Sequence, residues 1–455
     1  LEKEGYSFTD DSGKADIIIL NTCSVRQHAE DKVWSEIGRF KGQSPSGTVP
    51  LMGVIGCMAQ AHKEKIFERA PNVSFVVGPS DIYKIPGILK KLKRGQSPKS
   101  GDSPLFERKI WETDGTIRPD EIYHTGFYEN KSRAYVVISE GCSNFCSYCV
   151  VPYVRSALRN RKIQDILREI TEAVDRGIKN ITLLGQNVNA YRDEGGDFIQ
   201  LLSKVNDIGG LEEFSFVTSH PKDISPGLFS AMADLEKLKK HLHLPVQSGS
   251  NRILGLMNRG YTRESYLDLV DKYRKGVKVS TLSSDIIVGF PSETEDDFQD
   301  TYELVKNVEF NASFIFKYSP RPHTQAQNLP DDVQRKEKER RHSIILELQK
   351  EISRERKVQS EKRKVKTQSS KFLVLGFSFA LCALSFALPC YALNLDQAKI
   401  YFLKGDYKGG IAECEKLMAK STHSEADDEL YYILGLSYLK DGNLLRASDI
   451  FEIIL

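Results

Sequence analysis

Short apolar runs alternate with amphipathic stretches along the first third of the chain. The first runs span residues 15–20, 50–55 and 73–78, and helical periodicity follows over 29–40. Apolar runs of this length predict buried strands, and strand–helix alternation predicts a parallel sheet with helices on both sides. Residues 1–100 are therefore expected to form a small α/β domain with a parallel sheet.

The same rhythm resumes after a stretch rich in Gly, Ser, Pro and charged residues, for which we expect a linker over 101–130. Repeated βα units across about 200 residues predict a barrel, open or closed, over 131–335, with its site at the carboxyl ends of the strands. The expected strands are 134–138, 180–185, 213–217, 241–245, 279–288 and 314–316, with a helix over 164–176.

The pattern changes after residue 335. Residues 336–366 are highly charged, and Ile344, Leu348 and Ile352 fit one face of a helix. Its Lys and Arg side chains could meet RNA phosphates, or the helix could be solvated and pack on the barrel.

Residues 367–393 follow as a mostly apolar segment that is signal-like or transmembrane-like, although it is short for a bilayer. Residues 401–407 and 438–443 then recur at a spacing typical of tetratricopeptide repeats, which predicts an all-α tail over 394–455. We interpret the change as a fusion of two neighbouring reading frames, and a single-span membrane anchor is the alternative.

Composition narrows the class of protein only modestly. The length of 455 residues predicts two or three domains, and a net charge of +2 does not indicate a partner. The eight cysteines have no paired spacing, which predicts reduced thiols and a cytoplasmic location.

Three of these cysteines carry the strongest chemical signal. Cys142, Cys146 and Cys149 are spaced Cx3Cx2C directly after the apolar run 134–138. Three thiolates on one loop can hold three irons of a 4Fe–4S cluster and leave the fourth iron free to bind a small molecule. The alternatives are a zinc site completed from elsewhere in the chain and three structural thiols.

This loop resembles the signature of the radical S-adenosylmethionine (SAM) enzymes, in which an aromatic residue, here Tyr148, precedes the last cysteine. The resemblance implies a partial (β/α)6 barrel and a cluster whose open iron binds SAM. It also implies that reductive cleavage of SAM yields a radical that removes hydrogen from an unactivated C–H bond, with the cofactor supplying the difficult chemistry.

Cys23 and Cys57 each follow an expected strand, so both belong at the same edge of the first sheet. A single cysteine at a strand end is more often a small buried hydrophobic residue than a ligand. The segments 21–26 and 56–60 resemble the N-terminal domain of the methylthiotransferases. That resemblance implies an auxiliary 4Fe–4S cluster held by Cys23, Cys57 and a third cysteine, which we expect upstream of Leu1.

An ordered series of segments at the expected barrel rim resembles the same family, at 185–191, 218–221, 243–250, 258–262, 285–294 and 318–322. Taken singly, polar residues at strand ends usually form only local hydrogen bonds. The resemblance implies no catalytic side chain beyond the cluster ligands. It implies cofactor contacts from Tyr148, Gly185, Gln186, Asn187, Ser219, His220 and Gln247.

Residues 184–191 and 243–249 look like the branch that adds a methylthio group to C2 of isopentenylated adenosine beside the tRNA anticodon. The implied partners are a tRNA anticodon loop, whose unpaired bases are accessible, and an electron donor such as flavodoxin or ferredoxin. Two alternatives are a branch that acts on threonylcarbamoyl-adenosine or a ribosomal protein, and an inactive fusion that is a membrane-anchored tetratricopeptide protein. The RNA-binding β-barrel domain of the family does not follow the charged helix in this sequence.

Overall fold

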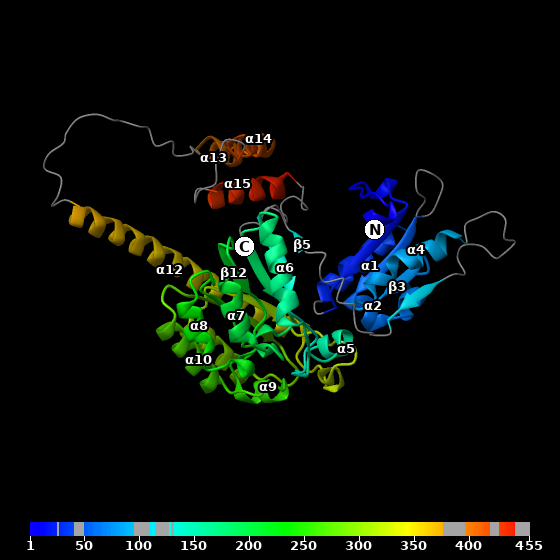
Figure 1. Ribbon diagram of the computed structural model, residues 1–455. Coiled ribbons are helices and arrows are strands. Elements are labelled where there is room, and N and C mark those ends of the chain that lie inside the picture. The colour runs from blue at the N-terminus through cyan, green and yellow to red at the C-terminus, as the bar shows by residue number, and fades with distance from the viewer. Residues whose placement is uncertain are drawn as a thin grey trace. The chain divides into compact units, whose positions relative to one another are not determined.

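The computed structural model describes residues 1–24, 27–40, 50–94, 109–113, 127–128, 132–375, 396–418 and 427–441. It divides into two units, Leu1–Lys366 and Thr367–Leu455, which are described separately. The first unit contains a small parallel sheet near the N-terminus and a larger open barrel (Figure 1).

The N-terminal sheet has four described strands in the order β1-β2-β3-β4, and every neighbouring pair is parallel. Alternate strand residues pack against helices on opposite faces, because successive side chains of a strand point to opposite sides. Val54 lies in a core with α1, α2 and α3, whereas Ile55 lies in a core with α4. The bounds are β1 Ile17–Thr22, α1 Gln27–Arg39, β2 Leu51–Gly56, α2 Cys57–His62, α3 Lys65–Arg69, β3 Phe75–Val77, α4 Ile85–Arg94 and β4 Ile110–Glu112.

Strand β4 differs from expectation, because Ile110–Glu112 falls inside the stretch expected to be a linker. Its residues pair with Phe75–Val77 and complete the sheet. Phe127–Tyr128, also within that stretch, forms β5 and pairs antiparallel with β6. The rest of the linker prediction lies outside the described residues.

The barrel is built from parallel strands in the order β6-β9-β12 and β13-β14-β15. The backbone of Phe214 links β12 to the residues just before β13, because its N–H donates to Lys237 O at 2.8 Å and its carbonyl accepts from Lys239 N at 2.8 Å. The bounds are β6 Arg133–Val137, β9 Asn180–Leu184, β12 Glu213–Phe216, β13 His241–His243, β14 Thr281–Val288 and β15 Ala312–Lys317. This arrangement confirms the expected fold class.

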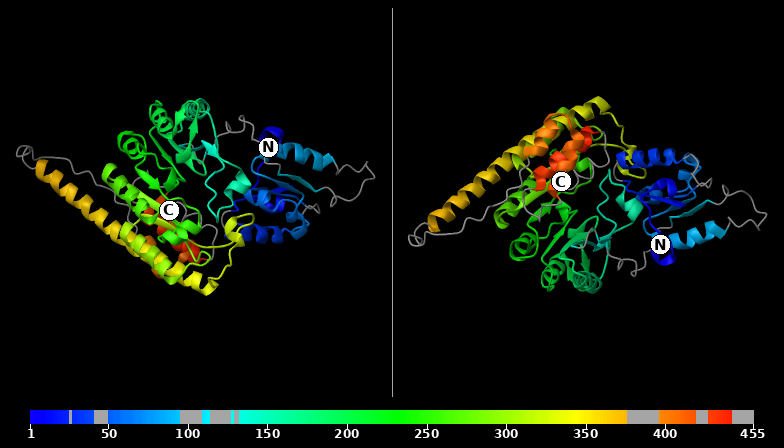
Figure 2. Two further views of the ribbon diagram at one scale, coloured as in Figure 1. Left: turned by 90° about the horizontal axis from the view of Figure 1, so that it is seen from below. Right: turned by 90° about the horizontal axis from the view of Figure 1, so that it is seen from above.

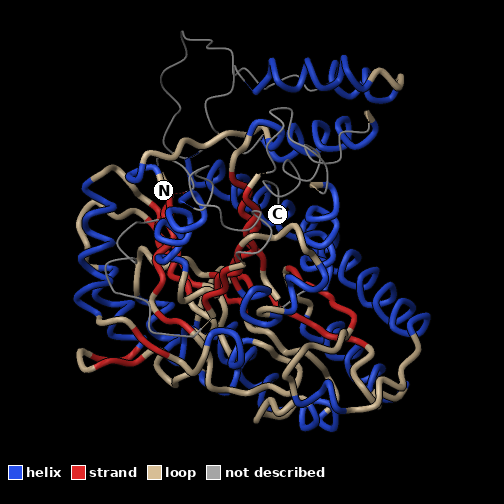
Figure 3. Tube along the Cα trace, turned by 90° about the vertical axis from the view of Figure 1, so that its right-hand side faces the viewer, coloured by secondary structure: helices blue, strands red, loops and turns tan. Residues whose placement is uncertain are grey.

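Helices cover the outer face of the barrel, and Figure 3 shows the strands inside and the helices around them. One continuous apolar core joins these helices to the strands, with members such as Ile166, Leu202, Phe214, Tyr273 and Leu304. The covering helices are α6 Ile163–Asp175, α7 Phe198–Asn206, α8 Leu228–Asp234, α10 Arg263–Gly276 and α11 Glu295–Val308.

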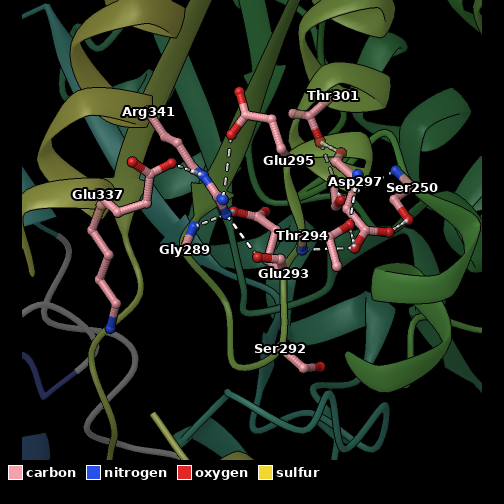
Figure 4. A network of polar contacts seen from close by, with 12 residues as sticks. Ser250, Gly289, Ser292, Glu293, Thr294, Glu295, Asp297, Thr301, Glu337 and Arg341 are labelled. Carbon is pink, nitrogen blue, oxygen red and sulfur yellow. Dashed lines mark hydrogen bonds and ion pairs between the residues drawn. The ribbon is translucent and has the colours of Figure 1, made fainter. Parts of the chain in front are cut away.

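Helix α12 (Arg335–Leu375) begins against the barrel, and its N-terminal part is yellow in Figure 2. Ile345, Leu348 and Ile352 are buried in the barrel core, as the apolar periodicity predicts. A polar network also holds the start of α12 (Figure 4). Arg341 Nη1 donates to Glu293 Oε2 at 2.7 Å, and Glu293 Oε2 accepts from Gly289 N at 2.6 Å, so the loop after β14 is tied to α12.

The described part of the second unit is helical, as expected for the tail. It contains α13 (Asp396–Leu403), α14 (Tyr407–Met418) and α15 (Asp427–Lys440), which share a small core around Ala398, Cys414 and Leu430. Most of the apolar stretch 367–393 lies outside the described residues. Among the residues that the structure does describe, no helix has both the length and the apolar character to cross a membrane.

Candidate functional site

The three-cysteine loop runs from β7 (Ser139–Glu140) to α5 (Val151–Arg155) at the carboxyl end of β6. The residues on either side of this segment lie close together, because β7 pairs antiparallel with β8 (Arg159–Asn160) just beyond it. Gly141 has a φ of +77°, and a Cβ there would lie 2.3 Å from Ala157 O, so the turn requires glycine. Gln186 Oε1 accepts a hydrogen bond from Gly141 N at 2.6 Å and ties the loop to the end of β9.

The thiols of this loop are free and largely withdrawn from solvent. Cys146 is buried, and Cys142 and Cys149 are half-buried. Burial raises the pKa of the Cys142 thiol, and burial together with the neighbouring Cys146 raises the pKa of Cys149 to about 12. Thiolates in this setting need a cationic partner, which is what an iron–sulfur cluster supplies.

A buried arginine lies against the loop from the opposite side of the barrel. Arg259 Nη1 donates to Cys146 Sγ at 3.3 Å and to Tyr148 Oη at 3.4 Å, while Nη2 donates to Pro245 O at 2.7 Å. Tyr261 Oη fixes Nε at 2.9 Å. Arg259 is only 4% exposed, so its charge faces the Cys146 sulfur away from solvent. The segment 258–262 can be recognised in the sequence, but the contact of Arg259 with Cys146 cannot.

His220 completes the polar surroundings of Cys146. Its Nδ1 accepts a hydrogen bond from Lys222 N at 3.2 Å, which leaves the proton on Nε2, 3.8 Å from Cys146 Sγ. Burial, and then the nearby Arg259 charge, lower the pKa of His220 to about 2. The ring is therefore neutral and donates a hydrogen bond toward the sulfur.

Asp223 links the cysteine loop to the next rim segment, and no sequence signal singled it out. Its Oδ2 accepts from Asn144 Nδ2 at 2.8 Å and from Asn187 Nδ2 at 2.6 Å. The two amides belong to different strand ends, so one carboxylate sets the distance between them.

Several buried polar atoms at this rim have no hydrogen-bond partner among the described residues. They are Asn187 Oδ1, Ser219 Oγ and Gln247 Oε1, together with Ser139 Oγ. An unpaired buried polar atom is costly, so such a group of atoms marks a site for a polar ligand. Gln247 also has a φ of 71°, and backbone strain of this kind is concentrated at ligand sites.

The remaining expected contacts also lie at this rim. Gly185 approaches Ser139 so closely that a Cβ would lie 2.4 Å from its Oγ. Tyr148 packs against the small core of Ile253, Met257 and Phe290, with its hydroxyl facing Arg259. The structure thus brings together the loop cysteines and all seven of the expected contact residues.

Cys23 and Cys57 lie together at the carboxyl edge of the N-terminal sheet. Cys23 is exposed and follows β1, and Cys57 is buried and begins α2 after Gly56, whose φ is +91°. Arg155 Nε, from the end of α5, donates to Cys57 Sγ at 3.2 Å. The hydrogen bond from Cys23, and then the Arg155 charge, lower the pKa of Cys57 against the opposing effect of burial.

The donor sets fit iron–sulfur clusters better than a single metal ion. Across the described ranges, no three His, Cys, Asp or Glu side chains converge as ligands of one ion. Three spaced thiols beside the buried cation Arg259 and several unpartnered oxygens suit a cluster with a polar ligand next to it.

Family models place two parts of the chain. Residues 136–305 match the Radical SAM superfamily, and residues 1–78 match an uncharacterized protein family, UPF0004. The barrel and its three-cysteine loop therefore define the class of protein as a radical SAM enzyme.

Curated relatives make the assignment more specific. A tRNA-2-methylthio-N(6)-dimethylallyladenosine synthase from Geobacter sulfurreducens is 43% identical over 361 residues, 79% of this chain and 79% of the relative. One from Thermoanaerobacter sp. is 43% identical over 79% of this chain and 75% of the relative. The chain belongs to this methylthiotransferase family. A solved radical SAM methyltransferase, TsrM from Kitasatospora setae, shares 12% identity, covers 69% of this chain and 66% of its own, and has a TM-score of 0.47.

Proposed function

We propose that this chain adds a methylthio group to C2 of isopentenylated adenosine in tRNA. The observation that carries the proposal is the three-cysteine loop beside a rim of unpartnered polar atoms, in a chain 43% identical to synthases of this name. The target base is expected in a single-stranded anticodon loop, where its edges are accessible.

Cys142, Cys146 and Cys149 would hold the SAM-binding cluster. When bound, the cluster and SAM supply the radical chemistry of this superfamily. The geometry supports the following roles for the protein residues. Arg259 and His220 direct N–H groups at Cys146, and Asn187, Ser219 and Gln247 offer polar atoms to SAM.

Cys23 and Cys57 would hold an auxiliary cluster that supplies sulfur, in accord with their shared position and with the Arg155 contact. A flavodoxin or ferredoxin would be the electron donor, and the cytoplasm the location. The helices of the second unit would be tetratricopeptide-like and take no part in the chemistry.

The test is nucleoside analysis of tRNA by liquid chromatography and mass spectrometry. A strain that accumulates isopentenyladenosine should regain its 2-methylthio derivative when it expresses the chain. The variant Cys142→Ala should restore none. Methylthiolated threonylcarbamoyl-adenosine with unchanged isopentenyladenosine would favour the other tRNA branch, and no change in either nucleoside would contradict the proposal.

A further inference from the structure

The inward face of the barrel is polar at His241 and His243 of β13 and at Thr281, Ser283 and Asp285 of β14. Leu242, Leu282 and Ile286 point outward and are buried in the apolar core under the helices. The alternate positions face inward, and His243 and Asp285 among them are partly exposed. Closed (β/α)8 barrels fill this space with branched apolar side chains, so a polar lining indicates a space for a polar ligand.

Thr281, His241, Ser283 and His243 are hydrogen-bonded in series on this face, because the two strands are parallel and in register. Thr281 Oγ1 lies 2.8 Å from His241 Nδ1, and Ser283 Oγ lies 3.2 Å from His241 Nε2. Ser283 Oγ also lies 2.9 Å from His243 Nδ1, and His243 Nε2 is 3.4 Å from Asp285 Oδ2. These hydrogen bonds fix the His243 ring, whose Nε2 faces the carboxylate of Asp285.

An exposed aromatic ring lies next to this carboxylate. Phe314 pairs with Asp285 across β14 and β15, and the residue is 49% exposed. Its ring meets His243 edge to face, with centroids 6.2 Å apart. An accessible aromatic face beside hydrogen-bonding side chains is the combination by which proteins bind unstacked nucleobases.

This group adjoins the rim of unpartnered atoms. Gln247 N donates to Asp285 O at 2.8 Å, and Gln247 Oε1 is one of those atoms. A base on Phe314 would therefore lie next to the ligand that the rim is built to hold.

We propose that Phe314, Asp285 and His243 bind the adenine of the substrate nucleotide. The base stacks on Phe314, and Asp285 Oδ1 accepts a hydrogen bond from the exocyclic N6–H while His243 holds Oδ2. This assignment rests on the proposed function and deepens it by naming the residues that recognise the base.

The test compares two labelled anticodon stem-loops by fluorescence anisotropy with the reconstituted full chain. One carries isopentenyladenosine and the other an abasic site at the same position. Phe314→Ala should weaken binding of the first about tenfold or more, because stacking on an aromatic ring contributes that much. It should leave binding of the abasic loop unchanged. Phe314→Tyr should restore the preference for the isopentenyladenosine stem-loop over the abasic one, and Asp285→Asn should reduce that preference.

Trp111→Ala is the matched control, since Trp111 is 53% exposed and lies on the N-terminal sheet. Equal losses of affinity for both stem-loops, or unchanged binding by a folded Phe314→Ala variant, would overturn the base site. Product formation by the wild-type chain would still uphold the proposed function. Wild-type chain that bound both loops equally and formed no product would overturn both.

Discussion

Arg155 and Cys57 lie 98 residues apart in the sequence, and Arg155 Nε donates a hydrogen bond to Cys57 Sγ at 3.2 Å. The arginine follows the three-cysteine loop, and the cysteine begins α2 of the N-terminal domain. Val150 and Val154 pack with Cys57 and Ala61 beside this contact. The end of the three-cysteine loop and the helix after it thus contact Cys57, the proposed ligand of the auxiliary cluster.

Arg155→Gln should raise the pKa of Cys57, because it removes a positive charge and a hydrogen bond from the thiolate. We expect a rise of about one unit. The Cys23 contact remains and keeps the pKa below its ordinary value. The pH dependence of Cys57 alkylation in metal-free protein, followed by mass spectrometry, measures the change.

Arg159→Gln is the control for this prediction. Arg159 and Arg155 both pair with Glu140, at 3.4 Å and 3.7 Å, but only Arg155 is bonded to Cys57. Equal alkylation profiles for the two variants would contradict the role of Arg155.

Replacing Cys142, Cys146 and Cys149 together by alanine should remove about four irons per chain after anaerobic reconstitution, since one cubane cluster is lost. Iron and acid-labile sulfide analysis measures the loss. Cys414→Ala, a buried thiol of the second unit, should change neither value. Zinc in place of iron in wild-type protein would refute the cluster assignment.

Gly141→Ala should impair cluster assembly. The residue has a φ of +77°, and a Cβ would lie 2.5 Å from Ser156 O, so the turn must open. Gly177→Ala carries the same kind of backbone strain, at a φ of +93°, but its Cβ meets no atom within 4 Å. Iron loading should fall in the first variant and be unchanged in the second. Similar loading of both would show that the turn tolerates a side chain.

Arg341→Met should destabilise the first unit by about 3–5 kcal/mol, because it leaves the buried carboxylate of Glu293 without its charge partner. The Arg341 side chain is 6% exposed and that of Glu293 is 0% exposed. Urea unfolding measures the change. Arg335→Met is the control, since Arg335 is 91% exposed and its ion pair with Glu339 should contribute about 0.5 kcal/mol or less. A small effect of Arg341→Met would mean that water reaches Glu293.

The stability contributed by Asp297 should be lost in acid. Burial opposes the effect, but hydrogen bonds from Arg252, Ser250 and Thr294 lower its pKa below the usual range. A carboxylate whose pKa is depressed by folding stabilises the protein above its unfolded pKa of about 4, and the contribution falls as the pH approaches the folded pKa. Wild type should be more stable than Asp297→Asn at pH 7. Urea unfolding should show the difference in free energy of unfolding between the two proteins becoming smaller below about pH 4. A constant difference would contradict this.

The local features of this molecule could be predicted from the sequence. Apolar runs mark β1, β2, β6, β9 and β14. The side chains of a strand alternate between two faces, so a strand that is buried on both faces needs consecutive apolar residues. The Cx3Cx2C spacing places three thiols on one loop because so few residues separate them. The predicted ends of strands likewise indicated where Cys23, Cys57 and the polar rim lie. Strand β4 (Ile110–Glu112) has only two apolar residues, and charged residues flank them, so that stretch was expected to be a linker.

Only the tertiary structure decided which distant residues meet. Arg259 reaches Cys146 across 113 positions, because the barrel brings the end of the loop after β13 beside the loop after β6. Arg155 meets Cys57, and Phe314 meets His243, for the same kind of reason. Sequence periodicity records which face of an element is buried, whereas contacts between polar groups on different elements depend on strand order and register.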